Sequence, residues 1–393
     1  MTSDNSFRYL GYAQEVIFGP GTLARLGEAV ERFGWRRLLL CTTGSASRLG
    51  HAAQVERILG ELWRASFDSV KPHVPETQVA EALVLARQHE VDAVIGLGGG
   101  SPIGMAKAVS QRLEEQRTGR PARAAFPTDQ PLVPVIAIPT TYAGSEMTST
   151  YGVTRQKTDG EWFKVTVTDP KVTAKLVIYD PELTLDLPPE LSASTGINAL
   201  AHCVEALYSM TRHPLSTAAA LSGLRAITSA LPRCYAAPRD LAARTEMLAG
   251  AHMAGASLAS AAMALHHGVC HVLGGTAGVP HGIANSIILP QAMRFNADLL
   301  VPPPPAAAWG ELTAAALGLP AAATPRAAAE AAADAVYDLI GRLGLPQHLR
   351  ETAVREAELP RLAQLAFESR TVQNNPKPIA GVAEIEALLR AAW

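Results

Sequence analysis

Short apolar runs alternate with amphipathic stretches through the first half of the chain, and this alternation restricts the folds open to it. Residues 36–41, 91–97 and 134–140 are largely apolar runs of strand length, while 51–63 and 76–90 carry apolar residues at helical spacing. Parallel strands need crossover connections, which helices between the runs would supply. Three more strand-like runs follow at 149–154, 163–168 and 175–180. We therefore expect an α/β domain built on a parallel sheet wound with helices.

The composition and the hydrophobic pattern of the sequence change after Pro181. The later segments are rich in Ala and Leu, with helical spacing and almost no β-branched runs. They are residues 190–232, 240–264, 281–299 and 325–342. We therefore expect two domains, an α/β domain over 1–182 and an all-helical domain over 183–393.

Composition and charge exclude several classes of protein. The chain has 393 residues, of which 48% are apolar and 18% charged, with a formal net charge of −2. This composition excludes a disordered protein, and without a run of Lys or Arg we expect neither nucleic acid nor a membrane as a partner. There is no apolar stretch of about 18 residues and no basic-then-apolar signal peptide. Because the four cysteines form no C-x-x-C pair and fit reduced thiols, we expect a cytoplasmic protein.

A glycine-rich turn follows the second of the strand-like runs. Gly98, Gly99, Gly100 and Ser101 lie between that run and a helix-like stretch that includes Pro102 near its start. Glycines let backbone N–H groups approach a phosphate closely, and a helix N-terminus adds free N–H groups and partial positive charge. The alternative is a tight turn that binds nothing, since the sequence matches neither G-x-G-x-x-G nor the P-loop pattern.

A second turn of similar character follows the run at 134–140. Thr140 and Thr141 open the segment PTTYAGSE, and their hydroxyls can donate to a diphosphate or contact a nicotinamide. Ligands of open α/β sheets bind beyond the carboxyl ends of the strands. Two such turns favour a nucleotide-binding site.

Four histidines fall within one short window, His266, His267, His271 and His281. His267 and His271 are four residues apart in a helix-like run, so they share a face. Any one of them could be a hydrogen-bonded structural residue, but four together favour an active site. His202, in the helical segment STGINALAHCVEALYS, is a fifth candidate.

A metal site is one interpretation of these histidines. His202, His267 and His281 would offer three imidazoles, which suit zinc or iron(II). Asn198 precedes His202 by four residues, so both lie on one helical face. A neutral amide is a weak ligand that cannot neutralise divalent charge, which counts against the metal.

Several segments together resemble the iron-containing (group III) alcohol dehydrogenase superfamily, over nearly the whole chain. The resemblance is strongest in GGGSPIGMAKA, PTTYAGSEMT, VIYDPELTLDLP, GINALAHCVEALY, HHGVCHVLGG and PHGIANSIILP. It implies a dehydroquinate synthase-like fold with a Rossmann-like nucleotide-binding domain, an all-helical domain and an active site in the cleft between them. It also implies a homodimer.

Three departures from the metal-using members resemble the maleylacetate reductase branch of this superfamily. Gly104 stands where those members carry the Asp of GGGSxxD, PTTYAGSE is one residue shorter than PTTSGTGSE, and Asn198 replaces the Asp of Asp-x-x-x-His. The resemblance therefore leads us to expect NADH or NADPH as cofactor and no metal requirement.

The resemblance also implies roles for individual residues. The residues implied in cofactor binding are Gly98, Gly99, Gly100 and Ser101 at the pyrophosphate, Thr140 and Thr141 at the phosphate and nicotinamide, Lys164 at the ribose, and Thr43. The residues implied in catalysis are His202, His267 and His281 at the former ligand positions, His271, Asn198 and Tyr142. Metal relatives that prefer NAD often carry an aspartate where this chain has Thr43, so we expect NADPH to be usable beside NADH.

The implied reaction is reduction of the C=C bond of maleylacetate, a small dicarboxylate, to 3-oxoadipate in aromatic hydrocarbon catabolism, including the resorcinol pathway. We expect imidazoles and the Asn198 amide to stabilise the enolate in place of a metal. Because a free histidine titrates near a pKa of about 6.5, we expect protonated histidines to attract the substrate and His271 to donate the proton. A metal-dependent alcohol dehydrogenase and a non-catalytic nucleotide- or metal-binding protein are the alternatives.

Overall fold

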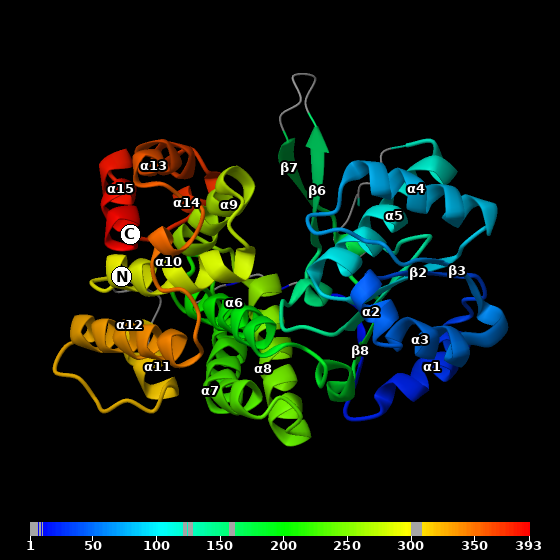
Figure 1. The fold of residues 1–393 in the computed structure, drawn as a ribbon, viewed down its shortest axis with the longest axis horizontal. Helices are drawn as coiled ribbons and strands as arrows, with labels where there is room; N and C mark the ends of the chain where they lie inside the picture. The colour runs from blue at the N-terminus through cyan, green and yellow to red at the C-terminus, as the bar shows by residue number, and fades with distance from the viewer. Residues whose placement is uncertain are drawn as a thin grey trace. The chain divides into compact units, whose positions relative to one another are not determined.

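The computed structural model in Figure 1 describes residues 7, 9, 11–120, 124, 129–156, 162–299 and 309–393, and the side chains of 162–164 lie outside that description. The chain forms two compact units. One comprises Leu10–Leu187, and the other comprises Pro188–Trp393 together with Met1–Tyr9. The boundary between the units lies between Leu187 and Pro188, five residues after the boundary that we expected between residues 182 and 183.

The α/β unit is built on a six-stranded sheet with the strand order β1-β8-β5-β4-β2-β3, and every neighbouring pair is parallel. The strands are β1 (Glu15–Phe18), β2 (Leu38–Cys41), β3 (Trp63–Phe67), β4 (Ala93–Gly98), β5 (Val135–Pro139) and β8 (Leu176–Tyr179). The prediction of a parallel-sheet α/β domain is confirmed. Strands β2, β4, β5 and β8 are buried at every position, which is why they are apolar without alternation.

Helices connect the successive strands from β1 to β5. They are α1 (Leu26–Phe33), α2 (Gly44–Arg48), α3 (His51–Leu59), α4 (Glu76–Gln88) and α5 (Gly100–Thr118). One core of this unit joins the inner faces of α1 and α3 to the sheet, through residues such as Val30, Val55 and Ile95. The apolar positions that predicted these helices therefore cover the sheet.

The runs at 149–154 and 163–168 do not join the parallel sheet. They form β6 (Thr150–Gln156) and β7 (Trp162–Thr168), an antiparallel pair separate from it (Figure 1). In β6 the buried residues Tyr151 and Val153 alternate with half-buried neighbours. Alternation of this kind belongs to a strand with one covered face, so these runs needed a different interpretation from the continuous apolar runs.

The second unit contains helices and no β-strand among its described residues, so the prediction of an all-helical domain is confirmed. Its helices are α6 (Pro189–Tyr208), α7 (Pro214–Ala236), α8 (Leu241–Ser260), α9 (Leu265–Ala277), α10 (His281–Phe295), α11 (Trp309–Ala316), α12 (Pro325–Arg342), α13 (Leu359–Phe367), α14 (Arg370–Gln373) and α15 (Val382–Ala391). Short 3-10 helices complete the chain at η1 (Thr22–Arg25), η2 (Gly60–Leu62), η3 (Ser145–Met147), η4 (Pro170–Val172), η5 (Pro181–Thr184), η6 (Leu349–Glu351) and η7 (Glu356–Glu358).

The segment 190–232 divides into two helices, α6 and α7, instead of one. His213 caps α7, because its Nδ1 accepts a hydrogen bond from the Ser216 backbone N–H at 3.4 Å while the Ser216 hydroxyl accepts one from the His213 N–H at 2.9 Å. Pro214 follows at the first helical position, where its missing N–H costs nothing. His213 is therefore a structural residue.

A core in the helical unit packs α9 and α10 against α13 and α15, with Val269, Ile287, Leu362 and Leu389 among its buried members. No single helix of the described residues has the length and hydropathy to cross a membrane, although the bent pair α8 and α9, with 98° between them, meets that test by length and composition together.

Candidate active site

The two predicted nucleotide-binding turns lie side by side at the carboxyl edge of the sheet. Strands β4 and β5 are neighbours with Gly98 opposite Pro139, and the Thr140 N–H donates to the Gly98 carbonyl at 3.0 Å. Strand β2 flanks β4 on the other side, and the Thr42 hydroxyl donates to the Leu97 carbonyl at 2.9 Å. The structure therefore brings Thr43, the glycine turn and the threonine turn to three adjacent strand ends.

The glycines are required by close backbone approach. A Cβ on Gly96 would lie 2.7 Å from the Ile103 Cα, so α5 begins directly against the strand. Gly98 has a φ of +135°, and a Cβ on Gly99 would lie 3.3 Å from the Thr141 side chain. The turn is thus an open backbone surface that ends at the N-terminus of α5, whose first N–H groups have no intrahelical partner. These residues fit a dinucleotide diphosphate.

A buried lysine that the sequence interpretation missed supports the threonine turn. The Lys107 ammonium donates to the carbonyls of Ser145 at 2.6 Å, Thr148 at 2.7 Å and Thr150 at 3.0 Å. Glu146, on the same turn, is buried and accepts a hydrogen bond from the Tyr179 hydroxyl at 2.8 Å. Burial lowers the pKa of Lys107 to about 7 and raises the pKa of Glu146. A lysine inside the apolar helical run IGMAKAV was the available signal.

Three further predicted residues belong to the α/β unit. Thr43 caps α2, since its hydroxyl accepts from the Ala46 N–H at 3.3 Å and shares a hydrogen bond of 2.8 Å with the Ser45 hydroxyl. Tyr142 follows β5 and is fully buried. Lys164 lies in β7, and its side chain falls outside the described residues.

The helical unit brings the predicted histidines together from three helices. The His202 ring of α6 stacks on the His267 ring of α9 with centroids 4.6 Å apart. The centroid of the His281 ring, at the start of α10, lies 6.2 Å from that of the His267 ring and 5.6 Å from that of the His271 ring. Asn198 lies one helical turn before His202 and is buried. The interpretation of one shared cluster therefore matches the geometry.

Glu205 organises this cluster, and the sequence interpretation missed it. Its buried carboxylate accepts from the His267 Nδ1 at 2.6 Å and from the backbone N–H groups of Ala264, His266 and His267 at 3.3, 3.0 and 3.3 Å. The Tyr208 hydroxyl adds a donor at 3.1 Å. The carboxylate thus holds the His267 ring with Nδ1 as the donor and Nε2 turned away.

Burial favours the neutral form of three imidazoles in this cluster, those of His202, His266 and His267. Burial, with the neighbouring His267, His266 and His271 rings, lowers the pKa of His202 well below its ordinary value. Burial also lowers the pKa of His266 and His267 to about 3. The expectation that protonated histidines attract the substrate is therefore wrong for these three, because removing an imidazolium from water costs more than the cluster returns.

A neutral imidazole whose ring nitrogen accepts no hydrogen bond can use that nitrogen's lone pair to bind a metal. His267 Nε2 and His202 Nδ1 are buried and have no hydrogen-bond partner in the part of the chain that the structure describes. A ring nitrogen of His267 bonded to a carboxylate, with the other left open, is the arrangement that metal-binding histidines adopt. The residues present fit a divalent metal.

A strand edge suited to a diphosphate in one unit and an imidazole cluster suited to a metal in the other match a metal-dependent oxidoreductase that uses a nicotinamide cofactor. Family models agree with this class. The model for iron-containing alcohol dehydrogenase matches residues 13–181, and the model for the C-terminal part of the Fe-containing alcohol dehydrogenase family matches residues 192–393. The chain belongs to the iron-containing alcohol dehydrogenase family, and it is an NAD(P)H-dependent oxidoreductase.

Individual relatives are more specific. A maleylacetate reductase of Pseudomonas knackmussii is 38% identical over 378 residues, which cover 96% of this chain and 95% of that protein. The crystal structure of maleylacetate reductase from Agrobacterium tumefaciens is similar with a TM-score of 0.82 at 32% identity, over 99% of this chain and 98% of that one. An iron-containing alcohol dehydrogenase from Corynebacterium glutamicum has a TM-score of 0.81 at 30% identity, over 98% and 96% of the two chains.

These matches correct our expectation that no metal is required. Both family models describe iron-containing enzymes, so the family implies a bound metal, and the prediction is wrong. The prediction counted the neutral amide of Asn198 as evidence against a metal, but the charge state of the histidines was not known from the sequence. Burial favours the neutral form of His202 and His267, and neutral imidazoles are suitable metal ligands.

Proposed function

We propose that this chain reduces the C=C bond of maleylacetate to 3-oxoadipate with NADH or NADPH. The observation that carries the proposal is the 38% identity to a maleylacetate reductase over 96% of the chain. The site supports it through two positions at which other members of the family carry an aspartate. Gly104 lies in the glycine motif and Asn198 lies beside the imidazole cluster.

In this proposal the strand-end turns of the α/β unit bind the cofactor. Gly98–Ser101 present backbone N–H groups to the diphosphate, and the hydroxyls of Thr140 and Thr141 contact the phosphate and nicotinamide side. Lys107 keeps the threonine turn in place through its three carbonyl contacts. When bound, NAD(P)H supplies the hydride.

His202, His267 and His281 would hold the metal of the family, with the Asn198 amide oxygen on the same side of α6. When bound, such a metal supplies a Lewis acid at the substrate carbonyl. Glu205 fixes the His267 tautomer for this purpose. Because Asn198 carries no charge, the ligand set leaves the site more positive than an aspartate would, which favours a substrate with two carboxylates.

His271 is the proposed proton donor. The hydride adds to the alkene carbon distant from the ketone, and the resulting enolate must take a proton at the carbon next to the ketone. The His271 ring lies 6.3 Å from that of His267 and 5.6 Å from that of His281, so it borders the proposed ligands without being one of them. A role for Tyr142 at this step, a cofactor contact of Lys164 and an active site in the cleft between the domains stay predictions.

A metal-dependent alcohol dehydrogenase is the second candidate function, favoured by the similarity to the Corynebacterium glutamicum enzyme. The two candidate functions differ in the substrate that is reduced. We expect NADH oxidation, followed at 340 nm, to be fast with maleylacetate and slow with a panel of simple aldehydes on the metal-loaded protein. Faster turnover of an aldehyde than of maleylacetate would replace our proposal with the alternative.

We further propose a homodimer in the cytoplasm, with neither nucleic acid nor a membrane as a partner. The relatives' common substrate supports a place in aromatic hydrocarbon catabolism, and a resorcinol pathway as the source of the substrate stays a prediction.

A further inference from the structure

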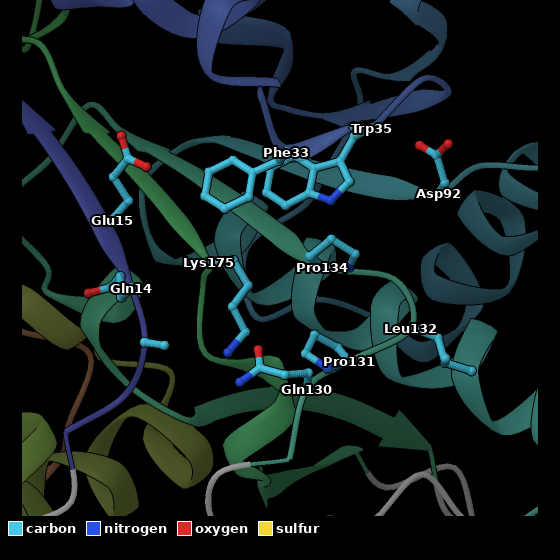
Figure 2. Close-up of a pocket in the computed structure, with 12 residues that line it drawn as sticks. Gln14, Glu15, Phe33, Trp35, Asp92, Gln130, Pro131, Leu132, Pro134 and Lys175 are labelled. Atoms are coloured by element: carbon cyan, nitrogen blue, oxygen red, sulfur yellow. The ribbon is translucent and has the colours of Figure 1, made fainter. Parts of the chain in front are cut away.

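A cavity of about 620 Å³ lies in the α/β unit, at the amino-terminal edge of the sheet (Figure 2). Its lining includes Glu15 at the start of β1, Asp92 just before β4, Pro134 just before β5 and Lys175 just before β8. The glycine and threonine turns lie at the opposite, carboxyl edge of the same strands. The cavity is therefore separate from the proposed cofactor site.

The charges that line this cavity are unbalanced. Glu15 forms an ion pair with Arg32, and Asp92 accepts from the backbone N–H groups of Arg36 at 3.1 Å and Arg37 at 2.9 Å. Lys175 is only 9% exposed, and its ammonium has neither a carboxylate nor a hydrogen-bond acceptor as partner among the described residues. Burial lowers its pKa, with no opposing charge to raise it. The Lys175 ammonium faces the cavity without a counter-ion from the described residues, so an anion bound in the cavity would pair with it.

Beside the polar side chains of Gln14 and Gln130, the lining has a flat apolar part. The rings of Phe33 and Trp35 stack with centroids 4.4 Å apart and planes at 4°. Pro131 and Pro134 line the cavity as well, and Figure 2 shows the ammonium end of Lys175 turned towards Gln130 and Pro131. Walls of this kind favour a planar apolar group, and the volume is typical of a small-molecule site.

We propose that this cavity binds an aromatic monocarboxylate, with the carboxylate paired to the Lys175 ammonium and the ring packed against the apolar wall. Lys175 is the one cation without an ionic partner among the described residues of the lining, so the cavity calls for one negative charge. A dicarboxylate would place its second charge near Glu15 and Asp92, and the described lining residues offer no second cation to pair with it. The inference does not depend on the proposed catalytic activity.

The test uses isothermal titration calorimetry of the full, metal-loaded chain with three small probes. Benzoate carries both the ring and the charge, acetate lacks the ring, and benzamide lacks the charge. We expect benzoate to bind at least about tenfold more tightly than either partial probe, the fold-change of a hydrogen bond to a charged group. Equal affinity of benzoate and benzamide, or of benzoate and acetate, would overturn the proposal on the wild-type chain alone.

Variants locate the binding. Lys175→Met keeps the length of the side chain, and the hydrogen bonds of Lys175 N to Val135 O and of Glu15 N to Lys175 O are made by the backbone and remain. We expect this variant to lose benzoate affinity by about tenfold or more. Lys71→Met, which removes an exposed lysine, is the matched control and should bind as the wild type does. Benzoate binding that survives Lys175→Met, or that falls equally in both variants, would refute the site.

Discussion

Replacing Glu205 with glutamine tests the organisation of the imidazole cluster. All five contacts to Glu205 come from donors. Glutamine offers one acceptor oxygen, so its NH₂ group must face some of those donors. If the oxygen faces His267, the NH₂ meets the His266 N–H. If it faces His266, the NH₂ meets Nδ1 of His267, which must then release its proton and carry one on Nε2.

The two orientations of the glutamine predict losses of different quantities, the free energy of unfolding and the metal affinity. Loss of a buried hydrogen bond to a charged group costs about 1.5–3 kcal/mol, so we expect the free energy of unfolding of the metal-free Glu205→Gln protein to fall by that amount. A proton on His267 Nε2 occupies the nitrogen that a metal needs. Carboxylates that orient metal-bound histidines contribute about 10–100-fold to affinity, and we expect a loss of metal affinity in that range.

The assay is competition for iron or zinc against a chelator, combined with urea unfolding of the metal-free protein. Tyr208→Phe is the matched control, because it removes a different donor to Glu205, the hydroxyl at 3.1 Å, and leaves the contact to His267 intact. We expect the control to lose stability and keep its metal affinity. Because each orientation of the glutamine lowers either stability or metal affinity, a Glu205→Gln protein in which both are unchanged would refute the reasoning.

Four other predictions concern single positions. His271→Ala should lower kcat by about 10²–10⁴, the usual contribution of a general acid, and near-normal turnover would remove His271 from the mechanism. Asn198→Asp should bind the metal more tightly, measured by chelator competition, and reduce maleylacetate more slowly because a new carboxylate faces a dianionic substrate; faster reduction would contradict this. With no acid at Thr43, kcat/KM for NADPH and NADH should differ by less than about tenfold, or 1.4 kcal/mol, and a clear preference would show that another group sets specificity. Gly268→Ala would place a Cβ 2.4 Å from Val372 Cγ2, so urea unfolding should show a loss of about 1–3 kcal/mol, and a stable variant would mean that α14 can move.

The sequence predicted those parts of the fold in which burial alone determines the pattern. The fully buried strands β2, β4 and β5 are apolar runs, and the helical unit repeats apolar residues at helical spacing. Strand β1 was missed because its four residues, EVIF, lie at the edge of the sheet and include an exposed end. The hairpin of β6 and β7 was assigned to the wrong sheet because strand pairing is a long-range choice.

The site was predicted only as far as residue type and spacing reach. His267 and His271 are four apart and share a helical face, and four histidines in one short window indicated a shared site. Glu205 was missed although H-x-x-E places it near His202, because the groups that it binds come from a helix about sixty residues later. The charge state of the imidazoles depends on burial, which spacing does not report, and the conclusion about the metal failed for that reason.

The three turns at the carboxyl edge of the sheet are far apart in the chain but adjacent in space, because β4 lies between β2 and β5. If the three turns bind the cofactor together as proposed, a chain in which only part of this sheet has formed offers it fewer contacts than the folded chain does. Cofactor binding energy is added to the folded state alone and shifts the folding equilibrium towards it by mass action. The concentration of the dinucleotide in the cell thus contributes to how long the α/β unit survives against unfolding and proteolysis.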